Sequence, residues 1–387
     1  MIREIAVRVL EFGYVCDHCL GRQFSRLGKE NNAEKGKVIR RFLCMEDTAE
    51  KTGADPANFR DKHPKCAVCE DVFERLPEIA EKIAKKTAGM EFETFLLGIR
   101  MSDSLVMNEE ALWERIDVRY SEPIKSEISR ELAGMIAEKT GRRQDAKRPD
   151  VIITFDLQKN ETEVFSNPIF IYGEYKKFVR GLPQTSSPHY RESVQDIIAK
   201  PFMKFSSAAS NVFHALGRED KEARCLVWRP FILELKQPVR RKIDLKRMEK
   251  AINRGKRVKV RGLKFCKKKD VSELKARRPY KVYRLVVDFE RKVENIEDAK
   301  KLAGTIKQRT PARVLGTKED KTKYKKVKSI KWKKINNKRY RFEITAESGL
   351  YLRELISGDN GRTKPSISGL LKNRAVIKEF DLVGLEE

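Results

Sequence analysis

Two cysteine pairs constrain the N-terminal part of this sequence more than any other feature. Cys16 and Cys19 are separated by two residues, and Cys66 and Cys69 repeat that spacing after an interval of 46 residues. Each short gap lets both thiolates face one ion, and four thiolates form the closed tetrahedral set of a structural zinc site. We therefore predict a structural zinc ion held by all four. The long interval leaves two alternatives, unrelated buried pairs or His63 as a substitute ligand.

Hydrophobic spacing divides the first half of the chain into two expected parts. Residues 2–12 and 70–90 have helical spacing, so 1–90 is expected to form a zinc-binding accessory region. From residue 91 onward strand and helix patterns alternate, with expected strands at 94–99, 151–155, 162–165 and 168–173 and a long helix at 122–139. This alternation predicts a compact α/β domain at 91–185. Its basic strand edges fit an RNA-binding module, and a purely structural insert is the alternative.

The rest of the chain, 186–387, is rich in strand signals and follows a linker-like segment at 186–188. The clearest strand is 339–346, where Tyr340, Phe342 and Ile344 alternate with polar residues. Further strands are expected at 226–235, 281–289 and 380–384, with a helix or turn at 349–359. We therefore expect an α+β protein whose last domain is built on a mixed sheet.

The charge of the chain limits the kind of partner it has. It contains 84 Lys and Arg against 57 Asp and Glu, a net charge of +27. Basic residues cluster at 236–281 (20 against 4 acidic) and at 317–339 (11 against 2). An enzyme of small metabolites does not need this self-repelling excess, whereas a polyanionic partner explains it. We expect the two runs to follow a phosphate backbone, the alternative being solvated faces.

Three further signals concern the location of the protein. Met1 leads directly into a charged amphipathic pattern, so we expect no signal peptide. No apolar run approaches the roughly 18 residues that a membrane span requires. Seven cysteines, an odd number, argue against a disulfide framework. We expect a cytoplasmic protein that has no membrane partner and is a monomer.

A turn at 217–220 carries the most promising catalytic group. Gly217 can adopt a backbone conformation that other residues avoid, so the turn can present Arg218 and Asp220 from a fixed loop. A surface turn whose acids cap a neighbouring element is the alternative. We find no phosphate-binding or dinucleotide glycine loop, and four histidines form no convincing triad. A reaction on RNA that uses an aspartate and no organic cofactor is the most economical interpretation.

Several motifs, in order along nearly the whole chain, resemble one family. They are Gly217-Arg218-Glu219-Asp220 followed by Arg229-Pro230-Phe231, Cys16 to Phe24, Tyr175 to Thr185, Gln308-Arg309-Thr310-Pro311, and Gly349-Leu350-Tyr351 running to Thr363. Together they resemble the archaeal/eukaryotic pseudouridine synthases that modify the T arm of tRNA at tRNA positions 54 and 55. The resemblance implies a THUMP RNA-binding domain at about 91–185 and a pseudouridine-synthase catalytic domain after it.

The resemblance also implies roles for individual residues. Asp220 is the catalytic aspartate, Tyr283 stacks on the uracil, and Arg353 pairs with the aspartate and keeps it ionised. Leu352 is expected to line the base pocket and Arg218 to contact substrate. From the residues alone, the alternative for Tyr283 and for Leu352 is a core side chain. The alternative for Arg353 is a phosphate contact.

The sequence departs from the family pattern in two places. Glu222 and the stretch 225–228 replace an aspartate and a glycine-rich stretch, and 315–318 replaces a histidine-arginine pair. The departures leave open whether position 54, 55 or both are modified. They also allow a rival interpretation, a non-catalytic tRNA-binding or chaperone protein with a degenerate synthase site. A THUMP-bearing tRNA methyltransferase or thiolase is a third, weakened by the missing cofactor loops.

Overall fold

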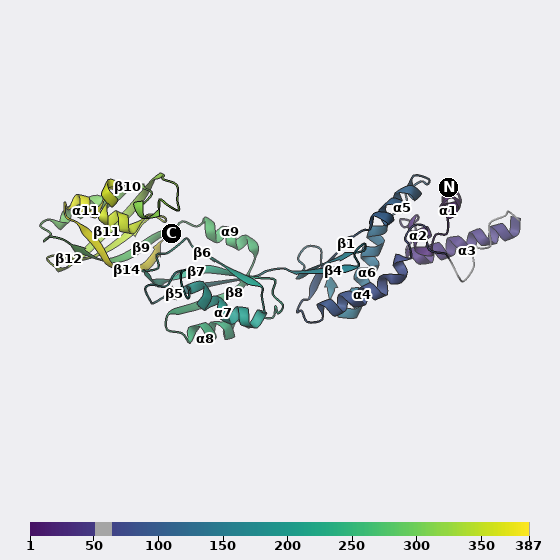
Figure 1. Cartoon of the computed structure of the whole chain (residues 1–387), viewed down its shortest axis with the longest axis horizontal. Coiled ribbons are helices and arrows are strands. Elements are labelled where there is room, and N and C mark those ends of the chain that lie inside the picture. Colours follow the sequence, from purple (N-terminus) through teal and green to yellow (C-terminus); the bar gives the residue numbers. More distant parts are fainter. Residues whose placement is uncertain (51–63, 387) are drawn as a thin grey trace. The chain divides into compact units, whose positions relative to one another are not determined.

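The computed structural model describes residues 1–50 and 64–386 and divides the chain into two compact units (Figure 1). The first unit is Met1–Asn167 and the second is Pro168–Glu387. Each unit has its own sheet and its own hydrophobic core. Among the described residues, no helix has the length and apolarity needed to cross a membrane.

In its described residues the first unit packs helices α1 to α6 with a four-stranded sheet of order β2-β1-β3-β4. Strands β1 and β3 run parallel, and β3 and β4 antiparallel. In chain order the elements are α1 (Ile2–Glu11), α2 (Asp17–Arg22), α3 (Asn32–Glu50), α4 (Val72–Thr87), β1 (Thr94–Arg100), α5 (Asp103–Trp113), α6 (Ile124–Thr140), β2 (Arg143–Gln144), β3 (Val151–Asp156) and β4 (Glu161–Ser166). The strand and helix positions expected at 94–99, 122–139, 151–155 and 162–165 correspond to β1, α6, β3 and β4.

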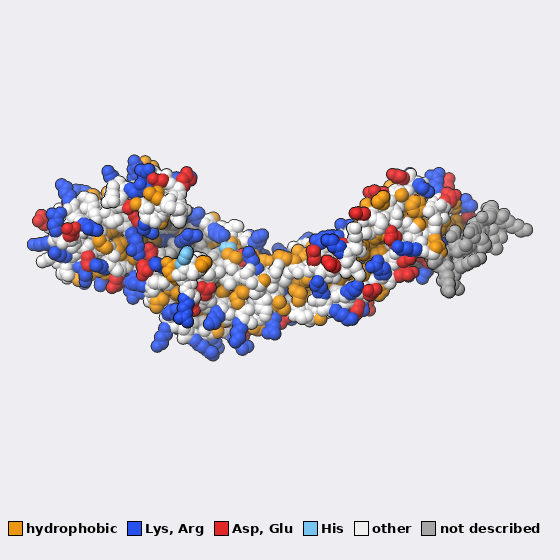
Figure 2. Space-filling view, in the orientation of Figure 1, with side chains coloured by type: hydrophobic (Ala, Val, Ile, Leu, Met, Phe, Trp, Pro, Cys, Tyr) orange, Lys and Arg blue, Asp and Glu red, His pale blue; other side chains and the backbone are white. Residues whose placement is uncertain are grey.

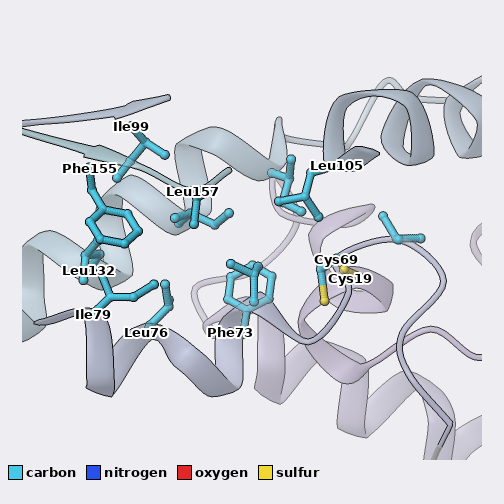
Figure 3. Packing of buried hydrophobic residues seen from close by; sticks show 14 of the residues in the cluster. Cys19, Cys69, Phe73, Leu76, Ile79, Ile99, Leu105, Leu132, Phe155 and Leu157 are labelled. Carbon is cyan, nitrogen blue, oxygen red and sulfur yellow. The ribbon is translucent and has the colours of Figure 1, made fainter. Parts of the chain in front are cut away.

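The core of the first unit continues from the sheet to the cysteine pairs. Helix α4 buries residues at helical spacing, among them Phe73, Leu76 and Ile79. Figure 3 shows Leu76 and Ile79 beside side chains of the sheet and of α6, while the sulfurs of Cys19 and Cys69 lie together beyond Phe73. The four cysteine positions are therefore part of the packed interior.

The second unit is organised around a ten-stranded mixed sheet. Nine strands follow the order β13-β10-β11-β12-β9-β14-β7-β5-β8, and β6 pairs with β7. All pairs are antiparallel except β14 with β7. The strands are β5 (Ile169–Lys177), β6 (Ser210–Ala215), β7 (Arg224–Lys236), β8 (Val258–Cys266), β9 (Tyr280–Phe289), β10 (Gly304–Arg309), β11 (Thr322–Asn336), β12 (Arg339–Ala346), β13 (Thr363–Lys364) and β14 (Ala375–Glu386).

Helices cover this sheet on both faces at its β8 end. The helices and 3-10 turns are α7 (Val194–Ser206), α8 (Leu245–Asn253), α9 (Lys268–Ala276), η2 (Ile296–Leu302), η3 (Ala312–Val314), α10 (Leu352–Ser357), η4 (Asp359–Gly361) and α11 (Ile367–Leu370). Figure 1 shows α7 and α8 on one side of β5 and β8, with α9 on the other. Alternation along β7 explains this, since Phe231 and Leu233 pack in the cluster under α7 and α8, and Ile232 in the cluster under α9.

Strand β5 lies in the sheet of the second unit, whereas the sequence pattern grouped 168–173 with the preceding α/β domain. Its full length is paired, on one side with β7 and on the other with β8. The unit boundary in the structure therefore falls at Asn167 and Pro168. The segment 186–188, expected as a linker, lies inside the second unit between β5 and α7.

The two basic runs form regular structure. The run at 236–281 contains α8, β8 and α9, and the run at 317–339 contains the long strand β11. Figure 2 shows Lys and Arg side chains projecting from the second unit around α8 and around the β10–β12 end of the sheet. Both runs therefore present their charge from a fixed framework.

Candidate active site

Asp220 lies on the loop 216–223 that joins β6 to β7, here called the Asp220 loop. Gly217 has φ +71°, in the left-handed region where a side chain would introduce strain. Its amide donates to the carbonyl of Ala215 at 2.8 Å, which turns the chain sharply out of β6. The amide of Glu222 then donates to Oδ1 of Asp220 at 2.9 Å, so the carboxylate is oriented by its own loop.

Arg353, at the start of α10, holds the Asp220 carboxylate from the opposite side. Its Nε lies 3.0 Å from Oδ2 of Asp220 and its Nη2 lies 3.4 Å from Oδ1. Burial works to raise the pKa of Asp220, but the Arg353 hydrogen bonds, the Glu222 amide and the charges of Arg353 and Arg313 outweigh it and leave that pKa lowered. The side chain of Asp220 keeps 27% of its surface exposed. An ionised, partly accessible carboxylate results.

Helix α10 is fixed by contacts to β10 and to the segment after it. Gln308, which is buried, donates from Nε2 to the carbonyl of Tyr351 and accepts from the amide of Tyr351, at 3.0 and 2.8 Å. Arg313 donates to Oε1 of the buried Glu354 at 2.7 Å. Leu352 is 7% exposed and belongs to the core cluster of this half of the sheet. The orientation of Arg353 therefore depends on packing and on two polar anchors.

Tyr283 lies on β9, two strands from β7 in the sheet order, and is partly buried. Burial raises its pKa, and the charge of nearby Arg229 offsets that only in part. Glu219, on the Asp220 loop, and Arg229, on β7, both influence Tyr283 electrostatically. In the sheet, Tyr283 pairs with Leu382 of β14, which pairs in turn with Cys225 at the start of β7, just after the Asp220 loop. Arg218 is exposed on the loop itself.

Three charged residues that lie within the motifs quoted above, but to which the sequence assigned no role, are buried within or beneath the Asp220 loop. Lys177 and Arg229 have no exposed surface, and Glu219 forms ion pairs with both, at 3.4 Å to Lys177 and 2.7 Å to Arg229. For Lys177, the alternation of β5 could have indicated burial. Lys177 occupies an inward position of β5, two residues after the buried Tyr175. A lysine at such a position is rarely buried without a partner.

Lys281 is a fourth buried charge near the loop. It is 5% exposed, and no hydrogen bond or ion pair joins its side chain to another described residue. It precedes Tyr283 by two residues on β9, so both side chains leave the same face of the strand. A Cβ added at Gly217 would lie 3.7 Å from its Nζ. Burial and the charge of Arg229 lower the pKa of Lys281 to about 8, with Glu219 acting in the opposite direction.

The four predicted metal ligands meet in the first unit. The Sγ atoms of Cys16, Cys19, Cys66 and Cys69 all lie within 4.8 Å of one another, and three of the four residues are buried. Arg22 donates to Sγ of Cys19, and the amide of Cys16 donates to Sγ of Cys66, each at 3.3 Å. Hydrogen bonds of this kind support metal-bound thiolates, so the residues fit a closed four-cysteine site. His63 lies outside the described residues.

Comparisons with known proteins agree on one family. The family model described as "Pus10, C-terminal" matches residues 170–386, and that described as "Pus10 THUMP domain, archaeal" matches residues 79–156. The tRNA pseudouridine synthase Pus10 of Pyrococcus furiosus is 37% identical, covering 99% of this chain and 97% of that protein. The proteins of the same name from Methanothrix thermoacetophila and Thermofilum pendens are 35% and 34% identical, each over 98% of this chain and over 93% and 94% of their own lengths.

A THUMP domain joined to a large mixed sheet that carries a synthase-family match defines the class, the pseudouridine synthases. Within that class, the chain belongs to the Pus10 family. The resemblance inferred from the motifs is confirmed, and so is the α+β fold class with its THUMP and synthase parts. The matches favour a synthase over the THUMP-bearing methyltransferase or thiolase considered from the sequence.

Proposed function

We propose that the protein isomerises uridine to pseudouridine in the T arm of tRNA, at position 54, position 55 or both, with Asp220 as the catalytic aspartate. The observation that carries the proposal is the Asp220–Arg353 ion pair, because it provides an ionised and partly exposed carboxylate in a chain of this family. The names of the relatives support tRNA as the substrate.

The chemistry requires a carboxylate and no redox partner. The bond between N1 of uracil and C1′ of ribose breaks while Asp220 either adds to C1′ or takes the proton from C2′. The released uracil turns within the pocket, and its C5 forms the new bond to C1′. As it does so, the bond between Asp220 and C1′ breaks or, on the other route, Asp220 returns the proton to C2′. The proton on C5 then leaves and a proton returns to N1, so substrate and product have the same atoms. A base inside a helix must be flipped out to reach the carboxylate.

Other side chains have proposed roles around that step. Arg353 keeps Asp220 ionised, Tyr283 stacks on the uracil, and Leu352 closes an apolar side of the pocket. Arg218, exposed on the Asp220 loop, is suited to contact a phosphate or the ribose of the substrate. The positions of Arg353 and Tyr283 on two different elements beside one loop support this assignment.

We propose zinc as the ion of the four-cysteine cluster, with a purely structural role. Four thiolates leave no open coordination position, so the ion would contribute folding energy to the first unit and take no part in the reaction. We propose tRNA as the partner of the two basic runs and of the THUMP domain. Consistent with a tRNA substrate, we place the protein in the cytoplasm as a monomer with no organic cofactor.

The test uses unmodified tRNA transcripts, carbodiimide adduct mapping and primer extension, because pseudouridine has the same mass as uridine. The expected result is a stop at position 54, 55 or both. Transcripts with cytidine at one of these positions assign each stop, and the position replaced must lose its signal. Tight binding without any stop on several transcripts would favour the non-catalytic tRNA-binding protein.

A further inference from the structure

The backbone of the Asp220 loop is held from below by buried side chains. Arg229 donates from Nη2 to the carbonyls of Leu216, at 2.7 Å, and Gly217. Lys177 donates from Nζ to the carbonyls of Asp220 and Lys221, at 3.3 and 3.2 Å. Four carbonyls of the turn, two on each side of residues 218 and 219, therefore have a cation as donor.

An amide side chain completes this arrangement from a third segment. Gln184 donates from Nε2 to the carbonyl of Gly217 at 3.2 Å and accepts from the amide of Glu219 at 3.2 Å. Gln184 is 7% exposed and belongs to the segment between β5 and α7. We call Lys177, Gln184 and Arg229 the loop clamp, with Glu219 as the shared counterion of the two cations.

Burial of the charges of the clamp costs desolvation free energy. Two side chains with no exposed surface carry charge into the interior, where a pair is favourable only with good geometry and satisfied hydrogen bonds. Hydrophobic residues of similar size are often as stabilising at such positions. A main chain whose carbonyls have several charged donors has little freedom to shift, and Asp220 lies on that main chain.

We propose that Lys177, Gln184, Glu219 and Arg229 are positioning residues for Asp220, fixing its main chain so that the carboxylate meets the ribose in one orientation. This inference rests on the proposed function, in which Asp220 performs the chemistry. None of the four needs to touch substrate. Because misplacement of a reacting group by about 1 Å costs up to about 100-fold in rate, loosening the clamp should lower kcat and leave tRNA affinity unchanged.

Two variants separate positioning from folding. Gln184→Ala removes two uncharged contacts and leaves the ion pairs intact. The double variant Lys177→Met with Glu219→Gln removes one positive and one negative charge together, so the net buried charge does not change. Arg229 keeps its hydrogen bonds to the loop carbonyls. Arg224→Lys is the matched control, because Arg224 begins the same strand as Arg229 but its side chain, among the described residues, bonds the carboxylate of Asp381 alone, at 2.9 and 2.6 Å.

Single-turnover rates and tRNA dissociation constants are measured on the full-length proteins. Thermal unfolding gives the folded fraction of each protein, and the rates are expressed per folded molecule. We expect a fall in rate of about 10-fold for Gln184→Ala and about 100-fold for the double variant, with dissociation constants within about twofold of the parent. The control should match the parent. Parent-like rates in both clamp variants would overturn the inference while leaving the proposed function intact. A parent protein that makes no pseudouridine overturns both.

Discussion

Arg353 and Asp220 are 133 positions apart in the chain, and their side chains meet with Nε at 3.0 Å from Oδ2. The guanidinium lies over the ring of Phe380, with its carbon 5.5 Å from the ring centroid, which limits its freedom. This pair lowers the pKa of Asp220 against the effect of burial. The protonation state of the carboxylate is therefore set by one neighbour on α10 together with the amide of Glu222.

The first prediction concerns the acid limb of activity. A carboxylate with a lowered pKa stays ionised to lower pH, so the parent should keep its kcat/KM as pH falls below neutrality. Arg353→Met removes the strongest interaction that lowers the pKa of Asp220 against the effect of burial. The acid limb should therefore move to higher pH, and kcat at neutral pH should fall about tenfold or more. The pH profile of kcat/KM measures this. Arg353→Lys retains the charge and should keep its acid limb closer to that of the parent; identical limbs in all three proteins would contradict the role of the pair.

The second prediction concerns the metal. Protein purified without chelator should carry one equivalent of zinc, and Cys16→Ser should lower both zinc content and the midpoint of thermal unfolding of the first unit. Elemental analysis and thermal unfolding measure the two effects. Cys225→Ser is the control, since Cys225 is buried in the second unit, outside the cluster. Full metal content in the Cys16 variant would show that these four residues do not share one ion.

The third prediction concerns tRNA binding and salt. Arg254 and Lys256 are exposed after α8 and form no ion pair with any described residue, whereas nearby Arg257 is paired with Glu192. Changing both Arg254 and Lys256 to Glu should weaken binding and reduce the slope of log K against log salt by about two.

Filter-binding or fluorescence titrations at several salt concentrations give that slope. Lys300→Glu is the matched control, because Lys300 is 71% exposed but lies outside both basic runs. An unchanged slope in the double variant would mean that this part of α8 and β8 faces only solvent.

The fourth prediction concerns Lys281, whose pKa is lowered to about 8 in the folded protein from 10.5. Below pH 8 the folded state carries the full cost of a buried ammonium, about 3 kcal/mol by this shift. Between pH 8 and 10.5 the unfolded chain binds a proton that the folded chain does not, so this cost declines as pH rises. Lys281→Met should therefore be more stable than the parent at pH 7 and lose that advantage by about pH 10. Urea unfolding at both pH values measures this, and a difference that does not change with pH would contradict it.

Much of the fold could be predicted because it is coded locally. The strand expected at 339–346 is β12, since its apolar and polar residues alternate without interruption. The sheet to which a strand belongs is a different matter. Strand β5 has inward apolar residues such as Ile169 and Ile171 that would suit either sheet, and only its pairing with β7 and β8 decides. In the β5–β7 pair the partners lie between 48 (Lys177 and Cys225) and 66 (Ile169 and Leu235) positions apart, so no local sequence pattern indicates the pairing.

The candidate site was predictable in part for a similar reason. Asp220 and Arg353 could be named through motifs, because the residue types and their order along the chain are distinctive. Lys177, Gln184, Glu219 and Arg229 lie within the same motifs, but the motifs do not indicate that these side chains are buried together at the Asp220 loop. Lysines are usually surface residues, and the burial of Lys177 depends on a partner, Glu219, that only the folded chain brings near. Lys281 is buried although its side chain has no such partner among the described residues. Charge counts along the sequence assign every lysine to the surface by default.

The central claim is that Asp220 performs the chemistry, and Asp220→Asn tests it most directly. Asparagine keeps the size of the side chain and can still accept from the amide of Glu222, but it lacks the charge that breaking the base–ribose bond requires. Parent and variant are compared on the same unmodified tRNA transcript, by dissociation constant and by carbodiimide mapping of the T arm. The account predicts equal affinity within about twofold and no pseudouridine in the variant. Pseudouridine formation by the variant at the rate of the parent would contradict it and remove Asp220 from the mechanism.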